Sequence, residues 1–164
     1  MVKQDRHTAQ AEGGVSVFAG AQCPKRKGCE SMIQGRIVKN FSLSEMMNTM
    51  AQDKTKLVIT PELVAFAEMV QELRDYHGKP LNVSSWYRTP TFNKKCGGSP
   101  NSAHLDGRAV DLLVTDYHDL TIAWNVITAR HGKIGGVNYY KTYMHFTDYE
   151  DKFGNKTFVV RDKR

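Results

Sequence analysis

The chain has 164 residues, of which 40% are hydrophobic and 24% are charged, and its formal net charge is +6. This length and composition predict one globular domain with a core of its own. No stretch is apolar enough to span a membrane, and the first residues lack the apolar core of a signal peptide. We therefore expect no membrane span and synthesis in the cytoplasm without a signal peptide.

Much of the positive charge lies near the N-terminus, where residues 1–39 contain seven Lys and Arg residues against three acidic ones. Such a segment attracts polyanions, which include nucleic acids, acidic membrane surfaces and anionic cell-wall polymers. Because no phosphate-binding glycine loop or aromatic-basic RNA motif accompanies it, we expect no nucleic-acid partner. The segment has few periodic apolar positions, so we predict an irregular arm over residues 1–39 and a folded domain over residues 40–164.

The three cysteines, Cys23, Cys29 and Cys96, are an odd number, which argues against a simple disulfide framework. Cys23 and Cys29 could close a small disulfide loop or supply two thiolates to a metal ion. Their five-residue spacer is wider than the usual spacing of a zinc knuckle. Reduced cysteines that bind no metal are the favoured interpretation.

Two helices are predicted in the first half of the folded part. Ser42, with Glu45 three residues later, is the capping-box pattern, and it predicts a short helix through about Met50. The pair Thr60-Pro61 is another helix-start signal, and the apolar residues after it recur at helical spacing until His77-Gly78. These signals place helices early in the domain.

Short β-rich segments dominate the second half. Residues 81–87 alternate apolar and polar side chains, and residues 109–114 form a short apolar run. Residues 134–137 and 143–146 are typical of two antiparallel strands. The remaining elements are a helical turn at 91–95, a helix at 120–130 and a last strand at 157–160. This order predicts an α+β fold in which a mainly antiparallel sheet is flanked by helices.

The stretch from His104 to Asp111 contains the first candidate metal ligands. A carboxylate in the buried strand that holds Asp111 is costly unless it is paired, hydrogen-bonded or bound to a cation. The Asp106-Gly107 turn allows the chain to fold back and bring an imidazole beside this carboxylate. The alternative interpretation is a surface histidine in a loop and an aspartate that caps a turn.

A third ligand would decide between these interpretations, and His145 is the candidate. It alternates with the apolar residues Met144 and Phe146 in a predicted strand. A lone histidine in a strand is more often a satisfied core residue than a ligand. The other histidines lie in the arm, in a polar loop or beside helix ends: His7, His77, His118 and His131.

Four sequence blocks carry a resemblance to a known family: Ser85–Asn93, Gly97–His104, Gly107–Asp111 and Tyr143–His145. Together they resemble the zinc peptidases of peptidoglycan. This family includes D-alanyl-D-alanine carboxypeptidases and dipeptidases and the L-alanyl-D-glutamate endopeptidases of phages. The resemblance covers residues 40–148 and implies the fold of these peptidases, which the hedgehog signalling domain shares.

The resemblance implies a Zn²⁺ site with His104, Asp111 and His145 as ligands and a fourth position for water. It also implies that Arg88 faces the substrate, where a guanidinium stabilises an oxyanion or binds a carboxylate. Asn93 and Ser102 match positions of the family motif. Either substrate binding or local hydrogen bonds that hold the loop would explain these two residues.

The sequence departs from the family at the general base. Many relatives carry a glutamate three residues before the last zinc histidine, and others an aspartate two residues after it, whereas this chain has Thr142 and Thr147 there. A carboxylate must reach the attacking water to accept its proton. Asp148 is the preferred candidate because it is the acidic residue closest to both positions, and Tyr143 is a weaker candidate proton donor.

The function that the resemblance implies is hydrolysis of a peptide bond in the stem peptides of bacterial peptidoglycan. The expected context is a phage product made in the host cytoplasm and acting at the cell wall, either as an endolysin or as a virion component. Residues 1–39 would then bind the anionic wall or neighbouring virion proteins. The alternative is a catalytically weak or inactive, zinc-stabilised binding or structural module of a virion, which the Thr142 departure favours.

Overall fold

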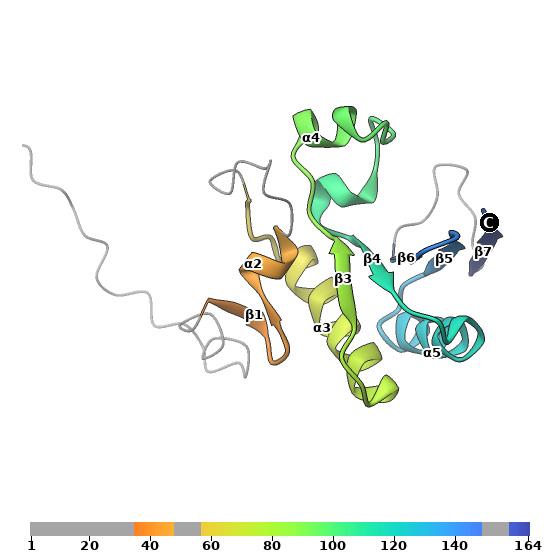
Figure 1. Ribbon diagram of the computed structural model, residues 1–164. Helices are drawn as coiled ribbons and strands as arrows, with labels where there is room; N and C mark the ends of the chain where they lie inside the picture. The colour runs from red at the N-terminus through yellow and green to blue at the C-terminus, as the bar shows by residue number, and fades with distance from the viewer. Residues whose placement is uncertain (1–34, 48–56, 149–157) are drawn as a thin grey trace, which may run out of the picture.

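A computed structural model describes residues 35–47, 57–148 and 158–164 of the chain (Figure 1). It has a mixed α+β architecture, which confirms the predicted class. The helices are α2 (Leu43–Met46), α3 (Pro61–His77), α4 (Pro90–Lys95), the 3₁₀ helix η2 (Ala103–Asp106) and α5 (Tyr117–Arg130). The strands are β1 (Arg36–Val38), β2 (Phe41–Ser42), β3 (Asn82–Ser85), β4 (Ala109–Leu113), β5 (Gly136–Tyr139), β6 (Met144–Thr147) and β7 (Val159–Asp162).

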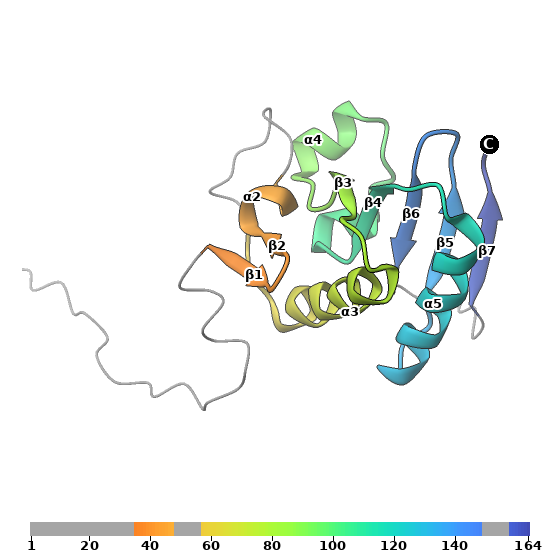
Figure 2. The same ribbon diagram turned by 60° about the horizontal axis from the view of Figure 1, so that its bottom comes forward.

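The main sheet has five strands in the order β3-β4-β6-β5-β7, and β5, β6 and β7 lie side by side in Figure 2. Three of its pairs are antiparallel, as predicted, and only β5 and β7 run parallel. The last strand lies at 159–162, two residues later than predicted. In this order β3 and β7 form the two edges of the sheet.

The helix boundaries follow from local capping. Ser42 and Glu45 form the predicted capping box at the start of α2. At the start of α3, the hydroxyl of Thr60 accepts a hydrogen bond from the backbone nitrogen of Leu63 at 3.2 Å. The helix ends at Gly78, whose φ of +69° is a left-handed conformation that glycine adopts without strain.

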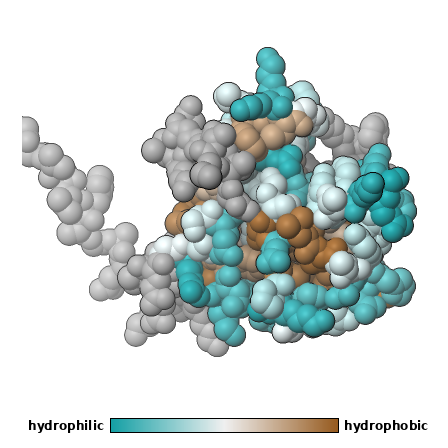
Figure 3. Space-filling view, in the orientation of Figure 1, coloured by the Kyte–Doolittle hydropathy of each residue, from teal (hydrophilic) through white to brown (hydrophobic). Residues whose placement is uncertain are grey.

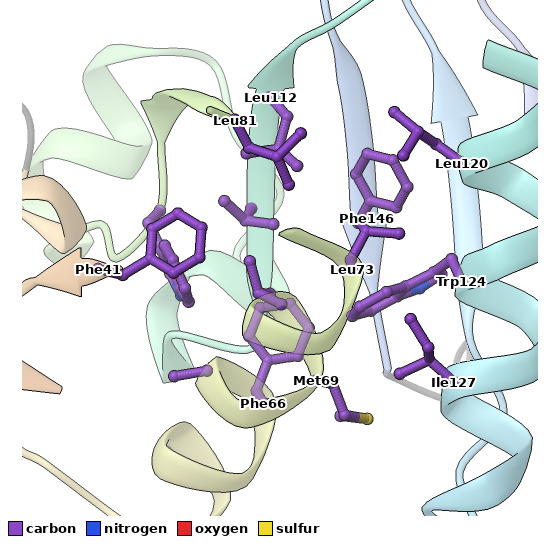
Figure 4. Packing of buried hydrophobic residues seen from close by; sticks show 14 of the residues in the cluster. Phe41, Phe66, Met69, Leu73, Leu81, Leu112, Leu120, Trp124, Ile127 and Phe146 are labelled. Atoms are coloured by element: carbon purple, nitrogen blue, oxygen red, sulfur yellow. The ribbon is translucent and has the colours of Figure 1, made fainter. Parts of the chain in front are cut away.

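The hydrophobic core lies between the sheet and the helices α3 and α5 (Figure 4). Phe66 of α3 packs edge to face against Trp86 and Trp124, with ring centroids 5.9 and 5.7 Å apart. Trp124 in turn contacts Phe146 of β6 at 5.6 Å. Phe146 of β6 and Val110 of β4 point into this core. Side chains alternate along a strand, so the neighbours of these two residues in each strand point to the opposite face of the sheet. That face holds the candidate site.

Residues 36–38 belong to the predicted arm, yet they form β1, which pairs with β2 and buries Ile37. The folded part therefore begins before Asn40. The first helix was predicted to run to about Met50, but α2 ends at Met46, with Met47 as its C-cap. The predictions for residues 1–34 of the arm, including Cys23 and Cys29, lie outside the described residues.

The surface in the orientation of Figure 1 shows a hydrophobic region near the centre, bordered by hydrophilic residues (Figure 3). Within the described ranges, no helix combines the length and the apolar character needed to cross a membrane.

Candidate metal centre

His104 is held by a short turn that fixes both its position and its tautomer. It lies in η2, where the hydroxyl of Ser102 accepts a hydrogen bond from its backbone nitrogen at 3.4 Å. Its Nδ1 lies 2.5 Å from the carbonyl oxygen of Trp86. A carbonyl only accepts hydrogen bonds, so Nδ1 carries the proton and the lone pair lies on Nε2. Burial lowers the pKa of His104, which favours this neutral form.

Gly107 ends the His104 turn with a φ of +69° and lies against α3. A Cβ at this position would meet Cδ1 of Leu63 at 2.6 Å. Two features of this position therefore require glycine: the left-handed backbone conformation and the close approach of the helix. The turn leads directly into β4.

Asp111 of β4 lies at the centre of the site and is 3% exposed. Its Oδ1 lies 3.4 Å from Nε2 of His104 and 2.8 Å from Nδ1 of His145, and its Oδ2 accepts a hydrogen bond from Nη2 of Arg88 at 2.5 Å. Burial alone would raise the pKa of this carboxyl group. Hydrogen bonding and charge interactions at the carboxylate outweigh burial and hold its pKa below the usual range, so Asp111 is a carboxylate at neutral pH.

His145 lies on β6 directly across from Asp111. Paired residues of neighbouring strands project on the same side of a sheet, so the register alone brings the imidazole beside the carboxylate. The His104 and His145 ring centroids are 5.0 Å apart. Thus η2, β4 and β6 each contribute one side chain to a single cluster.

The donor atoms of this cluster fit a metal ion. One ligand atom from each of His104, Asp111 and His145 lies within 4.8 Å of the others. Two imidazoles and a carboxylate are a usual donor set for a catalytic zinc ion. Donors at zinc-bonding distance in a tetrahedral site lie roughly 3.3 to 3.6 Å apart, and the separation between His104 and Asp111 is 3.4 Å. Small adjustments of the side chains would accommodate the ion.

Arg88 supports this cluster from the end of β3. Besides its contact with Asp111, its Nε donates to the hydroxyl of Ser85 at 2.8 Å, and its backbone nitrogen donates to the carbonyl of His104 at 2.9 Å. These contacts link Arg88 to two of the three cluster residues. The structure thus gives Arg88 a positioning role, while the substrate contact implied by the resemblance stays a prediction.

Asn93 and Ser102 hold the loop between α4 and η2. Asn93 is 2% exposed, and its Nδ2 donates to the carbonyl of Ser99 at 2.8 Å. A Cβ on Gly98 would meet Oδ1 of Asn93 at 2.1 Å, so the loop packs tightly on this side chain. The contacts match the loop-holding interpretation of both residues. Burial argues against direct contact between Asn93 and a substrate.

Asp148 forms a buried ion pair with Arg108. Its two carboxylate oxygens accept hydrogen bonds from Nε and Nη2 of Arg108 at 2.9 and 3.0 Å, and the residue is 3% exposed. Asp148 follows β6 three positions after His145, and side chains three apart in an extended segment project to opposite faces. The contacts assign Asp148 to the pair with Arg108, and its predicted general-base role stays a prediction.

We expect Asp148→Asn to lower the free energy of unfolding by about 1–3 kcal/mol, because Arg108 loses a charge-assisted partner in a partly buried setting. Urea unfolding of the variant checks this value, and zinc content should stay unchanged. Asp119→Asn, at an exposed acid of α5, is the control. Unchanged stability together with a large loss of turnover would instead support Asp148 as the general base.

Tyr143 lies two residues before His145 and projects on the same face of the sheet. It stacks on Tyr140 with ring centroids 4.5 Å apart. Burial raises the pKa of Tyr143, and the negative charge of Asp111 raises it further. The phenol is therefore protonated at neutral pH and is available as a hydrogen-bond donor on this face. Its predicted role in proton donation stays a prediction.

Two supporting groups were not evident from the sequence alone: the carbonyl of Trp86 and the hydroxyl of Ser85. Trp86 fixes the tautomer of His104, and Ser85 orients Arg88. Both lie in the block Ser85–Asn93 that carried part of the resemblance. The closeness of Ser85 and Trp86 to Arg88 in the sequence was the signal that could have identified them. The contact between Trp86 and His104 joins residues 18 positions apart, so only the folded structure reveals it.

Comparison with known families agrees with this geometry. The family model described as Peptidase M15 matches residues 39–147, about two thirds of the chain. The chain belongs to the Peptidase M15 family. No curated protein matches the chain. Peptidase M15 members are zinc peptidases, and the cluster of His104, Asp111 and His145 lies within the matched range.

Proposed function

We propose that this Peptidase M15 chain is a zinc-dependent peptidase that hydrolyses a peptide bond in the stem peptides of peptidoglycan, with His104, Asp111 and His145 as the zinc ligands. The observation that carries the proposal is the convergence of these three donors within 4.8 Å. They lie on the sheet face opposite the core. The resemblance to peptidoglycan peptidases supports the substrate class.

A bound zinc ion would supply the Lewis acidity that activates water and polarises the scissile carbonyl. The chain's own residues prepare the site for it. Trp86 keeps the lone pair of His104 on Nε2, and Arg88 binds Oδ2 of Asp111, which leaves Oδ1 directed at the histidines. Tyr143 is a neutral hydrogen-bond donor beside them. Fixed donors of this kind lower the reorganisation that catalysis requires.

The test is incubation of purified peptidoglycan with the zinc-loaded protein, followed by identification of the new amino termini. We expect one class of new termini, their loss with a chelator, and their return when zinc is restored. The position of the termini also distinguishes carboxypeptidase from endopeptidase activity. No cleavage by protein that holds one zinc ion per chain would reject the peptidase proposal.

A second candidate function is a zinc-stabilised binding or structural module without strong catalysis. Two observations favour it: Thr142 occupies the usual position of the general base, and Asp148 is bound to Arg108. In this case the protein would bind peptidoglycan without releasing new amino termini. A sedimentation assay with insoluble peptidoglycan, run beside the cleavage assay, separates the two functions.

The biological setting that we propose is a phage infection, in which the protein is an endolysin or a virion component. The resemblance to phage L-alanyl-D-glutamate endopeptidases supports this setting, and so does the basic composition of residues 1–39. These residues would bind the anionic wall in the first case and neighbouring virion proteins in the second. Mass spectrometry of purified virions distinguishes the two cases.

A further inference from the structure

A pair of tyrosines closes the hairpin between β5 and β6, whose loop lies at the upper end of these strands in Figure 2. The backbone nitrogen of Tyr140 donates to the carbonyl of Tyr143 at 2.9 Å, which continues the register that pairs Tyr139 with Met144. Residues in register on neighbouring strands project on the same side of a sheet. Tyr140 and Tyr143 therefore share a face, and only two residues separate them in the chain.

The shared face is the one that holds the candidate metal cluster. Met144, between Tyr143 and His145, is fully buried in the core. Side chains alternate along a strand, so Tyr143 and His145 both project away from the core. The hydroxyl of Tyr139 contacts α5 on the core side, and Tyr140 consequently projects to the other face. Tyr140 and Tyr143 are both half-buried, so part of each side chain is open to a substrate.

The two rings form a stacked pair. Their centroids are 4.5 Å apart, and their planes differ by 13°. Tyr140 thus covers one face of the Tyr143 ring and restricts the rotamers that are open to it. The hairpin hydrogen bond fixes the two backbones, and the ring contact fixes the two side chains. The direction of Tyr143 is therefore set inside the hairpin.

Tyr143 lies within electrostatic reach of the metal cluster. Burial raises the pKa of its phenol, the negative charge of Asp111 raises this pKa further, and the guanidinium of Arg88 lowers it. The effect of a charge on a pKa falls off with distance, so both charged groups lie near the phenol. The raised pKa keeps the proton on the phenol at neutral pH, and Tyr143 can donate a hydrogen bond beside the candidate ligands.

We propose that Tyr140 is a positioning residue for Tyr143, and that Tyr143 donates a hydrogen bond to the carbonyl oxygen of the scissile bond as negative charge develops on that oxygen. A donor that is already oriented stabilises the transition state without a cost of reorganisation. Tyr140 acts through its ring, which supports the Tyr143 ring, and its own hydroxyl takes no part. This inference rests on the proposed function for the position of the scissile bond.

A double-mutant cycle with a synthetic stem pentapeptide as substrate tests this pair. Tyr143→Phe keeps the ring and removes the donor, so kcat should fall about 100-fold while KM changes little, because the hydrogen bond strengthens in the transition state. Tyr140→Ala should lower kcat about tenfold, since the donor remains but loses its orientation. Tyr140→Phe keeps the stacked ring and should restore kcat. In the Tyr143→Phe background, Tyr140→Ala should have no further effect on kcat.

Binding of phosphinate peptides gives a readout that needs no turnover. A phosphinate places a tetrahedral, negatively charged group where the scissile carbonyl would lie, and the analogues carry it at each bond of the stem pentapeptide in turn. Titration calorimetry with zinc-loaded protein should show one analogue that binds tightly. Its Kd should rise about tenfold in Tyr143→Phe and less in Tyr140→Ala, because a charge-assisted hydrogen bond is lost or misdirected. Zinc content should be the same in all variants.

Tyr76→Ala and Tyr76→Phe, at a tyrosine of α3 that is 63% exposed, are the matched controls and should change neither kcat nor Kd. Three results would overturn the inference: an additive effect of Tyr140→Ala in the Tyr143→Phe background, loss of zinc from Tyr140→Ala, or unchanged kcat and Kd in Tyr143→Phe. Failure of Tyr140→Phe to restore kcat would also do so. If the unaltered protein cleaves nothing but the same cycle appears in Kd, the tyrosine pair stands and the peptidase proposal fails. Neither cleavage nor phosphinate binding would reject both.

Discussion

Replacement of His145 with alanine is expected to weaken zinc binding by more than about 100-fold, because loss of a direct ligand exceeds the 10- to 100-fold cost of losing an outer partner. His145 is one of three converging donors, and two donors hold zinc poorly. Its side chain is 17% exposed and lies on the face opposite the core, so the substitution leaves the core packing intact. Peptidase activity should disappear with the metal.

Elemental analysis of the dialysed protein and a competition titration with a chromogenic chelator measure this change. The unaltered protein should retain one zinc ion per chain. His118→Ala, at a histidine whose side chain is 87% exposed, is the matched control and should bind zinc normally. One tightly bound equivalent in His145→Ala would remove His145 from the ligand set.

Replacement of Arg88 with lysine should weaken zinc binding about 10- to 100-fold, which is the usual effect of losing a residue that supports a metal ligand. The value of kcat/KM should fall by at least the same factor. Lysine keeps the positive charge but cannot bind Asp111 and Ser85 at once, because it lacks the planar fork of the guanidinium. Asp111 then loses the contact that fixes its orientation.

Measurement of zinc affinity and of kcat on the same preparations separates the two roles of Arg88. Weaker zinc binding identifies the positioning role that the contacts indicate. Normal zinc binding with a lowered kcat identifies the substrate contact that the resemblance implies. Ser85→Ala is the control, because it removes only the acceptor of Nε, and its effect should be smaller. Normal values for both quantities in Arg88→Lys would refute both roles.

The sequence predicted those features that depend on local chemistry. The capping box at Ser42 and the start and end of α3 at Thr60 and Gly78 were correct, since neighbouring residues supply these contacts. The candidate ligands were also visible, because a carboxylate inside a short apolar strand is costly without a partner. The structure brings His104, Asp111 and His145 together as the resemblance implied.

Features that depend on strand order were not predictable in the same way. Nothing local to residues 157–164 shows that β7 lies parallel to β5, so Arg161 could not be placed beside Asn138 from the sequence. The partner of Asp148 was equally hidden from the sequence. Arg108 lies 40 residues away, so only the fold brings the two side chains together, and the general-base role of Asp148 stays a prediction.

The position of β7 at the edge of the sheet has a consequence for behaviour at high concentration. An edge strand presents unpaired backbone groups to solvent, and a long apolar edge invites pairing with another chain and growth of aggregates. Here the outer strand is four residues long, includes Arg161 and Asp162, and continues into Lys163 and Arg164. Within the part of the chain that the structure describes, these charges and the short length oppose addition of a strand from a second molecule at β7.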